Sequence, residues 1–375
     1  MRIFYDYQAF NIQRRGGISR YILETAERVA NFSGCEAKVF AFAHINLSLA
    51  ENTKVRSVGH LVNDRFFHTR ARTQLDQMLT RRELQQFRPD IVHETYYSER
   101  GLVGSKSKTV VTVHDMIHEK FLANRKDVAP TVAAKRTSVL RADHVICVSE
   151  NTKSDLLDLI PVSSEKVSVV HLGSSFNLVS EAEAGILRGG SGRRPYLLYV
   201  GDRSNYKNFY GLLTAYCQSK LLHKNFDLVC FGSHAFTMNE SFAISQTGLP
   251  AGTVRHECGD DSALKRAYIM ASAFVYPSLY EGFGLPPLEA MACRCPVICF
   301  SVGSIPEVAG SAAAFCEDES SDALQLAIEA VVSDDKLRSR LIETGAERVG
   351  HFSWDRCARE TLEVYKNIAK RTRIL

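Results

Sequence analysis

Two glutamates in the second half of the chain, Glu281 and Glu289, have the type and spacing to hold a ligand together. They bracket the segment Glu-Gly-Phe-Gly-Leu-Pro-Pro-Leu-Glu. The apolar run 273–276 before it predicts a buried strand, and the pattern over 287–293 predicts a helix. The first carboxylate is therefore expected at the end of a strand, and the second about one turn into a helix.

The chemistry of this segment follows from the helix N-terminus that lies between the two glutamates. Free backbone N–H groups and the positive end of the helix dipole favour an anion such as phosphate. Carboxylates beside an anion site are suited to binding hydroxyl groups. A ligand that combines phosphate, ribose hydroxyls and sugar hydroxyls is a nucleotide sugar.

The segment closely resembles the E-x7-E signature of retaining glycosyltransferases with the GT-B fold, in glycosyltransferase family 4. The resemblance includes Gly-Phe after Glu281, Gly-Leu-Pro before the helix, then Glu-Ala-Met-Ala-Cys from Glu289 and a following Pro-Val. It implies that Glu281 holds donor-sugar hydroxyls, helped by the backbone amides of Phe283, Gly284 and Leu285, and that Glu289 holds ribose hydroxyls. The alternative is a strand–loop–helix unit with two solvated carboxylates.

A second segment, residues 199–209, carries basic residues between a strand that ends at Gly201 and a helix that Lys207 opens. A lysine and an arginine beside a helix N-terminus would neutralise a diphosphate. Lys207 matches the family's lysine six residues after this glycine, which contacts the diphosphate. Asp202 stands where the family often has an arginine, and Arg203 follows it. The alternative is a solvated basic loop.

The glycine pair Gly16 and Gly17 lies between the first predicted strand and the first predicted helix. Two glycines there let backbone amides approach an oxyanion closely. The pair is similar to the family's glycines that face the diphosphate across the cleft, and a purely structural turn is the alternative. The segment is not G-x-G-x-x-G, so the dinucleotide-binding fingerprint is absent.

His114 and Asp115 end the apolar run 109–113, a place well suited to a site in a parallel sheet. His114 resembles the family's strand-end histidine, which lies near the donor sugar and the acceptor. A structural histidine is the alternative. His93 and Glu94 end the preceding strand in the same way, and a site role for them stays open.

Composition limits the classes of protein. A length of 375 residues predicts two domains, and 45% hydrophobic with 23% charged residues is typical of a globular protein. A net charge of +4 does not indicate a nucleic-acid partner. No run approaches the ~18 apolar residues of a membrane span, so we expect a cytoplasmic protein. The ten cysteines form no C-x2-C pair or Cys/His cluster, which argues against a zinc site.

Alternating strand-like and helix-like segments predict an α/β protein. We expect two doubly wound Rossmann-like domains that face a central cleft, the GT-B fold. Residues 1–180 would form the first domain, 181–195 a linker with a glycine run, and 196–354 the second, with helix 355–375 returning to the first. The expected strands are 2–7, 37–43, 90–93, 109–113, 144–148, 167–171, 196–200, 227–231, 273–276 and 296–299.

The resemblance implies a retaining hexosyltransferase that uses GDP-mannose or a UDP-hexose and a glycan or polyprenyl-diphosphate-linked acceptor, in polysaccharide or lipopolysaccharide biosynthesis. Lipid-linked acceptors leave open a peripheral contact with the inner membrane surface. Neither a metal nor a cofactor is expected, because basic residues would stabilise the leaving diphosphate. The predicted catalytic residues are His114, Lys207 and Glu281; the predicted donor-binding residues are Gly16, Gly17, Arg203, Lys207, Glu281, Phe283, Gly284, Leu285 and Glu289.

Three other functions fit parts of these patterns. A GT-B nucleotide-sugar epimerase would release nucleotide without an acceptor, and a non-catalytic GT-B scaffold in a polysaccharide-assembly complex would bind nucleotide without turnover. A Rossmann dehydrogenase fits the alternation of strands and helices but lacks the glycine fingerprint.

Overall fold

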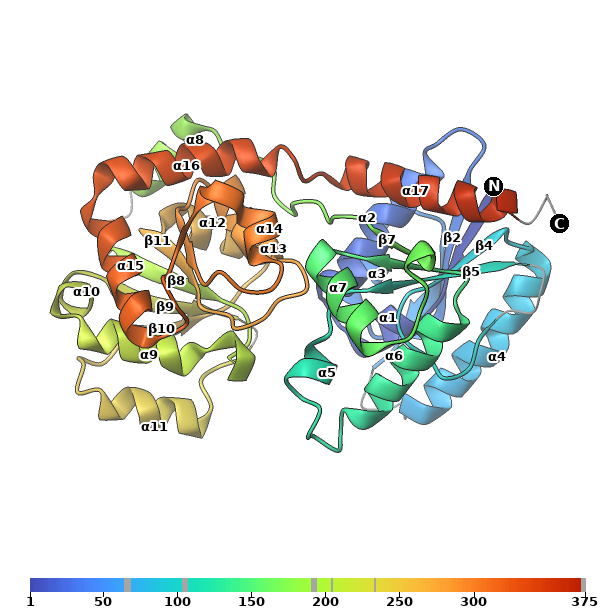
Figure 1. Cartoon of the computed structure of the whole chain (residues 1–375), viewed down its shortest axis with the longest axis horizontal. Helices are drawn as coiled ribbons and strands as arrows, with labels where there is room; N and C mark the ends of the chain where they lie inside the picture. Colours follow the sequence, from blue (N-terminus) through green and yellow to red (C-terminus); the bar gives the residue numbers. More distant parts are fainter. Residues whose placement is uncertain (64–68, 103–106, 190–193, 204, 233, 372–375) are drawn as a thin grey trace. The chain divides into compact units, whose positions relative to one another are not determined.

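Two parallel sheets organise the chain, one in each of two units (Figure 1). Unit 1 comprises Met1–Gly173 and Trp354–Leu375, and unit 2 comprises Ser174–Ser353. The structure is a computed structural model that describes residues 1–63, 69–102, 107–189, 194–203, 205–232 and 234–371. The arrangement confirms the predicted α/β class with two doubly wound, Rossmann-like sheets.

Unit 1 holds a seven-stranded parallel sheet in the order β3-β2-β1-β4-β5-β6-β7. The strand order reverses between β1 and β4, which is the pattern of a doubly wound sheet. The strands are β1 Arg2–Tyr5, β2 Glu36–His44, β3 Ser57–Leu61, β4 Ile91–Glu94, β5 Lys108–Val113, β6 His144–Cys147 and β7 Val167–Val169. The helices are α1 Gln8–Ile12, α2 Gly17–Ala30, α3 Leu47–Ala50, α4 Thr69–Phe87, α5 Ile117–Lys120, α6 Ala129–Arg141, α7 Glu150–Leu159 and α17 Trp354–Arg371.

Unit 2 holds a six-stranded parallel sheet in the order β10-β9-β8-β11-β12-β13. Its strands are β8 Tyr196–Val200, β9 Asp227–Phe231, β10 Val254–Glu257, β11 Ala273–Tyr276, β12 Val297–Cys299 and β13 Ala313–Phe315. Its helices are α8 Glu181–Gly189, α9 Phe209–Gln218, α10 Lys220–Asn225, α11 Met238–Gln246, α12 Asp261–Met270, α13 Leu285–Ala292, α14 Ile305–Ala309, α15 Ser321–Ser333 and α16 Asp335–Val349.

Both faces of the second sheet are covered, which explains why its strands are nearly continuous apolar runs. Leu197 and Val275 point to one face, into a core cluster shared with α9 and α15. Phe274 points to the other face, where its ring centroid lies 5.3 Å from that of Tyr268 in α12. Packing on both faces therefore fixes the strands from which the site loops emerge.

The expected linker, residues 181–195, differs from what the structure shows. Residues 181–189 form α8, which packs on α12 and whose Glu183 pairs with Lys265 at 3.0 Å. The seven residues before α8 also belong to unit 2, because the Val179 N–H donates to the Ala292 carbonyl at 2.8 Å. The change of unit thus lies at 173/174, and most of the predicted glycine run, residues 190–193, falls outside the described residues.

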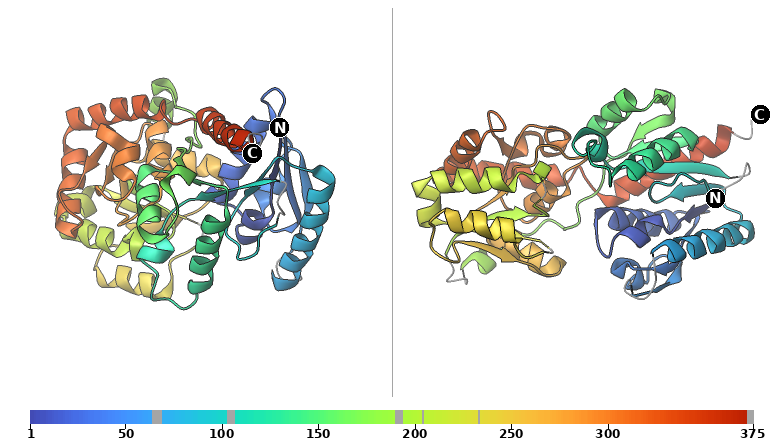
Figure 2. Two further views of the ribbon diagram at one scale, coloured as in Figure 1. Left: turned by 45° about the vertical axis from the view of Figure 1, so that its right-hand side comes forward. Right: turned by 90° about the horizontal axis from the view of Figure 1, so that it is seen from below.

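A buried polar network attaches the last helix, α17, to the sheet of unit 1. His93 Nδ1 lies 2.6 Å from the Tyr365 hydroxyl of α17, and His93 Nε2 lies 2.9 Å from Thr112 Oγ1. The Tyr5 hydroxyl lies 3.2 Å from that of Tyr365. Figure 2 shows α17 beside the strands of this unit, where it packs against α2. His93 therefore serves packing, and burial lowers its pKa to about 3, so that the ring is neutral.

No helix among the described residues is long and apolar enough to cross a membrane.

Replacing Tyr365 with phenylalanine should destabilise unit 1 by about 1–3 kcal/mol, because His93 Nδ1 would remain buried without its partner. The chain's one tryptophan, Trp354, lies at the start of α17, so its fluorescence during urea unfolding reports on this helix. Tyr210→Phe is the matched control, because that side chain is 45% exposed. Equal stability of the two variants would show that the network does not hold α17.

Candidate active site

Lys207 and Glu281 meet at the carboxyl edge of the second sheet. Lys207 ends the 3-10 turn Asn205–Lys207 after β8, and Glu281 lies in the loop after β11. Since β8 and β11 are parallel neighbours, both loops emerge at the same edge. The Lys207 ammonium donates to Glu281 Oε1 at 2.6 Å, and the two side chains are 14% and 11% exposed. The structure thus brings together two residues that are 74 positions apart in the chain.

The ion pair keeps Lys207 charged in a place with little water. Burial favours the neutral amine, but the charge and hydrogen bond of Glu281 outweigh it, and the pKa of Lys207 is raised above its usual 10.5. The rings of Tyr206 and Tyr276 lie 5.3 and 5.5 Å from the ammonium, within reach of cation–π attraction. A desolvated cation of this kind interacts strongly with any anion that reaches it.

The segment that follows β12 holds the loop that carries Glu281 in place. The Ser304 hydroxyl lies 2.9 Å from the Glu281 carbonyl oxygen and 2.6 Å from that of Phe283, and Ser304 is fully buried. Gly303 has φ +54°, and a Cβ there would lie 3.0 Å from the Glu281 carbonyl oxygen. Sequence reasoning missed Gly303 and Ser304, although a Gly-Ser pair soon after a buried strand is a recognisable turn signal.

Helix α13 begins where the sequence predicts a phosphate-binding helix end. Gly284 precedes it with φ +122°, a conformation that favours glycine. Two of its first three residues are Pro286 and Pro287, which lack N–H groups. Fewer amides are therefore available than at an ordinary helix start. The N–H groups of Gly284 and Leu285 donate to no other described residue, so they remain candidates for a ligand.

Glu289 lies in the second turn of α13 and is 7% exposed, as the expected spacing requires. The Tyr268 hydroxyl lies 3.4 Å from Glu289 Oε2. Burial and the nearby Glu289 carboxylate both raise the pKa of Tyr268 well above 10, so this hydroxyl is a donor to Glu289. The ribose-binding role of Glu289 stays a prediction.

Arg203 lies in a different environment from the one the sequence suggests. Its guanidinium pairs with Glu240 at 2.9 Å and donates to the carbonyls of His234 and Ala235 at 2.8 and 2.9 Å. Glu240 closes the capping box that Thr237 opens at the start of α11. The guanidinium therefore fastens this loop to α11, and it is only 5% exposed. Sequence reasoning missed this partner, although the Thr-x-x-Glu capping pattern is readable. Contact with a donor diphosphate stays a prediction.

The remaining predicted residues lie in unit 1. Gly16 caps α2 and Gly17 is the first residue of that helix. A Cβ on Gly16 would meet only the end of the flexible Gln13 side chain, 2.4 Å from its Oε1, so packing alone does not require glycine here, and the anion-binding role stays a prediction. His114 follows β5, and its ring lies edge-to-face with Tyr21 at a centroid distance of 5.3 Å. His114 Nε2 is buried without a hydrogen-bond partner among the described residues.

Burial lowers the pKa of His114 to about 4, and the positive charge of Lys135 adds to the effect against the attraction of Asp115. The imidazole is therefore neutral at pH 7 and can donate or accept a hydrogen bond, but it carries no charge.

Within the described ranges, no group of three or more His, Cys, Asp or Glu side chains is arranged to hold a metal ion.

Two sequence families match adjacent halves of the chain. The model of Glycosyltransferase Family 4 matches residues 15–175, and that of Glycosyl transferases group 1 matches residues 189–348. Each half of the chain is thus similar to glycosyltransferases, and neither model alone spans half of it. The Escherichia coli O-antigen chain mannosyltransferase B is 30% identical over 59% of this chain. The match spans only 60% of that relative's length.

Solved structures with the same fold match nearly the whole chain. Sucrose-phosphate synthase from Thermosynechococcus elongatus superposes with a TM-score of 0.76 at 19% identity, covering 98% of both chains. Anabaena Alr3699/HepE, in complex with UDP and glucose, superposes with a TM-score of 0.72 at 17% identity, covering 100% of this chain and 99% of that one. At these identities the likeness establishes the fold.

Replacing Gly303 with alanine should destabilise unit 2 more than replacing Gly252 does. Both glycines have positive φ, +54° and +86°, so each alanine carries a backbone strain of about 1 kcal/mol. Only the Cβ at position 303 meets the Glu281 backbone, while the one at 252 meets no atom within 4 Å. Urea unfolding of both variants measures the difference. Equal losses would mean that the Glu281 loop tolerates displacement.

His114 should show no protonation between pH 8 and pH 5.5 by NMR of its ring C–H groups, whereas an ordinary histidine titrates near 6.5. His114→Asn identifies the resonance. Because the unfolded chain takes up this proton at a higher pH than the folded one, His114 lowers the free energy of unfolding as pH falls from about 6.5 towards 4. A His114 titration midpoint above pH 6 would contradict its burial.

Proposed function

We propose that this protein transfers a hexose from a nucleotide sugar to a hydroxyl group of a glycan or lipid-linked acceptor, with retention of the anomeric configuration. The observation that carries the proposal is the buried pair of Lys207 and Glu281 beside the start of α13. A cation and a carboxylate held 2.6 Å apart offer complementary partners to a sugar diphosphate, one for the phosphate and one for the hydroxyls.

The bond that breaks joins the anomeric carbon of the donor sugar to an oxygen of the β-phosphate. Its cleavage leaves negative charge on the diphosphate, and the Lys207 ammonium stabilises that charge where little water competes. Glu281, released from Lys207 by the phosphate, accepts hydrogen bonds from sugar hydroxyls. Glu289 accepts them from the ribose. The acceptor loses its proton to the leaving phosphate as its oxygen bonds to the anomeric carbon on the same face.

One relative and one structural neighbour guide the choice of donor and acceptor. The Escherichia coli relative is a mannosyltransferase of the O-antigen chain, which favours GDP-mannose and a saccharide acceptor in lipopolysaccharide or polysaccharide synthesis. The Anabaena structure holds UDP and glucose, which keeps UDP-hexoses as the second donor class. A lipid-linked acceptor would bring the protein to the cytoplasmic membrane surface.

Lys207→Met should lower kcat by about 10²-fold or more, because it removes the cation that faces the leaving group. Release of nucleoside diphosphate from GDP-mannose and UDP-hexoses, with and without glycan or lipid acceptors, is the assay. Lys224→Met, at an exposed position of α10, is the control. Unchanged kcat in Lys207→Met would overturn the role of this residue.

The single substitution leaves the Glu281 carboxylate buried without its cation, which can weaken the fold. The double variant Lys207→Met/Glu281→Gln removes both charges, so it should unfold at a temperature closer to that of the natural protein while staying inactive. Release that needs no acceptor would indicate an epimerase instead, and absence of release with every donor and acceptor would indicate a non-catalytic scaffold.

Activity should persist in EDTA. In the proposed reaction Lys207 supplies the positive charge that a divalent cation would otherwise supply to the diphosphate, so no metal is needed. The same release assay, after chelation and after addition of Mg²⁺, measures this. Complete loss that Mg²⁺ restores would refute the proposed stabilisation of the leaving group.

A further inference from the structure

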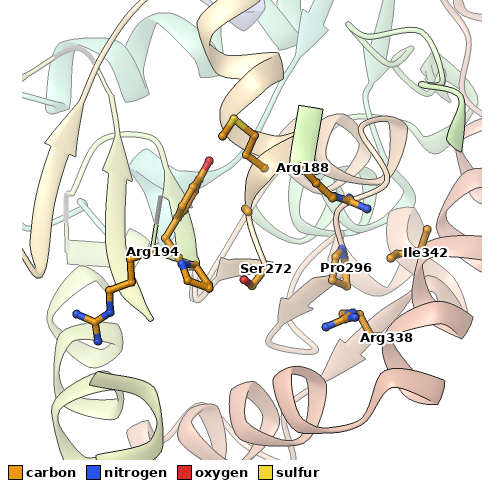
Figure 3. A pocket seen from close by; sticks show the side chains of 10 residues that line it. Arg188, Arg194, Ser272, Pro296, Arg338 and Ile342 are labelled. Atoms are coloured by element: carbon orange, nitrogen blue, oxygen red, sulfur yellow. The ribbon is translucent and has the colours of Figure 1, made fainter. Parts of the chain in front are cut away.

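A pocket of about 310 Å³ lies at the amino edge of the second sheet (Figure 3). Pro195, Ser272 and Pro296 line it, and they immediately precede β8, β11 and β12. Because these strands are parallel, the pocket lies at the opposite edge of the sheet from Lys207 and Glu281. The proposed sugar transfer does not use it.

Three arginines line this pocket and none of its described lining residues is acidic. Arg188 lies in the last turn of α8, Arg194 precedes β8, and Arg338 lies in α16. In Figure 3, Arg188 and Arg338 lie on either side of Pro296, and Arg194 lies on the far side of Ser272. Positively charged side chains from three separate segments therefore surround the pocket.

Two of these three arginines, Arg188 and Arg338, have no buried carboxylate partner among the described residues. Arg188 donates to the carbonyls of Ile269 and Arg294 at 2.8 and 2.6 Å, and no described carboxylate pairs with it. Arg338 pairs with Asp335 at 2.9 Å, but Asp335 is 85% exposed, so this surface pair contributes little. Arg194 differs, because Asp227 balances its charge at 3.1 Å.

The arginines also act on one another. Loss of water around its guanidinium lowers the pKa of Arg188, and the positive charges of Arg338 and Arg294 lower it further. Cations that repel one another beside a pocket without a carboxylate are stabilised by a bound anion. Guanidinium groups match the geometry of phosphate oxygens in particular.

We propose that this pocket binds a small phosphate-bearing molecule, with the phosphate between Arg188 and Arg338. Pockets for organic ligands range from about 300 to 1,000 Å³, so this one is at the small end. Its size favours inorganic phosphate or a sugar phosphate over a whole nucleotide sugar. Ser272 also lines the pocket and adds a hydroxyl group.

The test is titration calorimetry of the full chain with inorganic phosphate and with a hexose phosphate, at fixed ionic strength because salt screens such contacts. Arg338→Gln should raise the dissociation constant about tenfold or more, as expected for one lost charged hydrogen bond. Arg340→Gln, two positions further along α16 and outside the pocket, is the matched control and should leave it unchanged. Arg188→Lys should also weaken binding, because lysine lacks the planar fork.

Lys207→Met separates this site from the proposed donor site. Phosphate affinity should survive in that variant, and its loss there would place the anion at the donor site and overturn the proposal. Equal affinity in Arg338→Gln and Arg340→Gln, or no binding of either anion, would also overturn it. Sedimentation with vesicles that contain phosphatidic acid provides a second arm. Vesicle binding that Arg338→Gln abolishes, without binding of soluble phosphates, would assign the pocket to a lipid headgroup instead.

Discussion

A buried lysine requires an anionic partner, and the candidate site is built around this constraint. Lys207 stays charged away from water mainly because Glu281 lies 2.6 Å from it. Holding Glu281 there needs the positive φ of Gly303, whose missing Cβ lets the backbone pass, and the buried Ser304 hydroxyl beneath the loop. A buried pair of this kind contributes little to stability once the cost of desolvation is included. In the proposed reaction the pair is a preformed place for an ionic ligand.

In unit 2 the two candidate sites lie at opposite edges of the parallel sheet. Loops at the carboxyl ends of β8 and β11 carry the Lys207–Glu281 pair, and the residues before the same strands line the arginine pocket at the other edge. Ligands of doubly wound sheets bind outside the carboxyl ends of strands, so the first edge is where a donor is expected. In unit 1, burial keeps two histidines near the carboxyl ends of the central strands neutral: His93 within β4 and His114 directly after β5.

The sequence predicts well the central strands and the positions of Glu281 after a strand and Glu289 in a helix, because these signals are local. Apolar runs identify β8 and β11, and the spacing of Glu281 and Glu289 follows from one strand–loop–helix segment. The short strands β3, β10 and β13, all at sheet edges, were not expected, since β3 and β10 carry few consecutive apolar residues and β13 has only three residues. The contact between Arg203 and Glu240 was not predicted, because the two residues are 37 positions apart and a tertiary contact at that distance leaves no local pattern.

The most direct test is a crystal structure of the protein with bound GDP or UDP. The account predicts a diphosphate oxygen within hydrogen-bond distance of Lys207 Nζ, with Glu281 displaced from its 2.6 Å contact and the ribose hydroxyls at Glu289. A nucleotide bound at another place, with the Lys207–Glu281 pair intact, would contradict it.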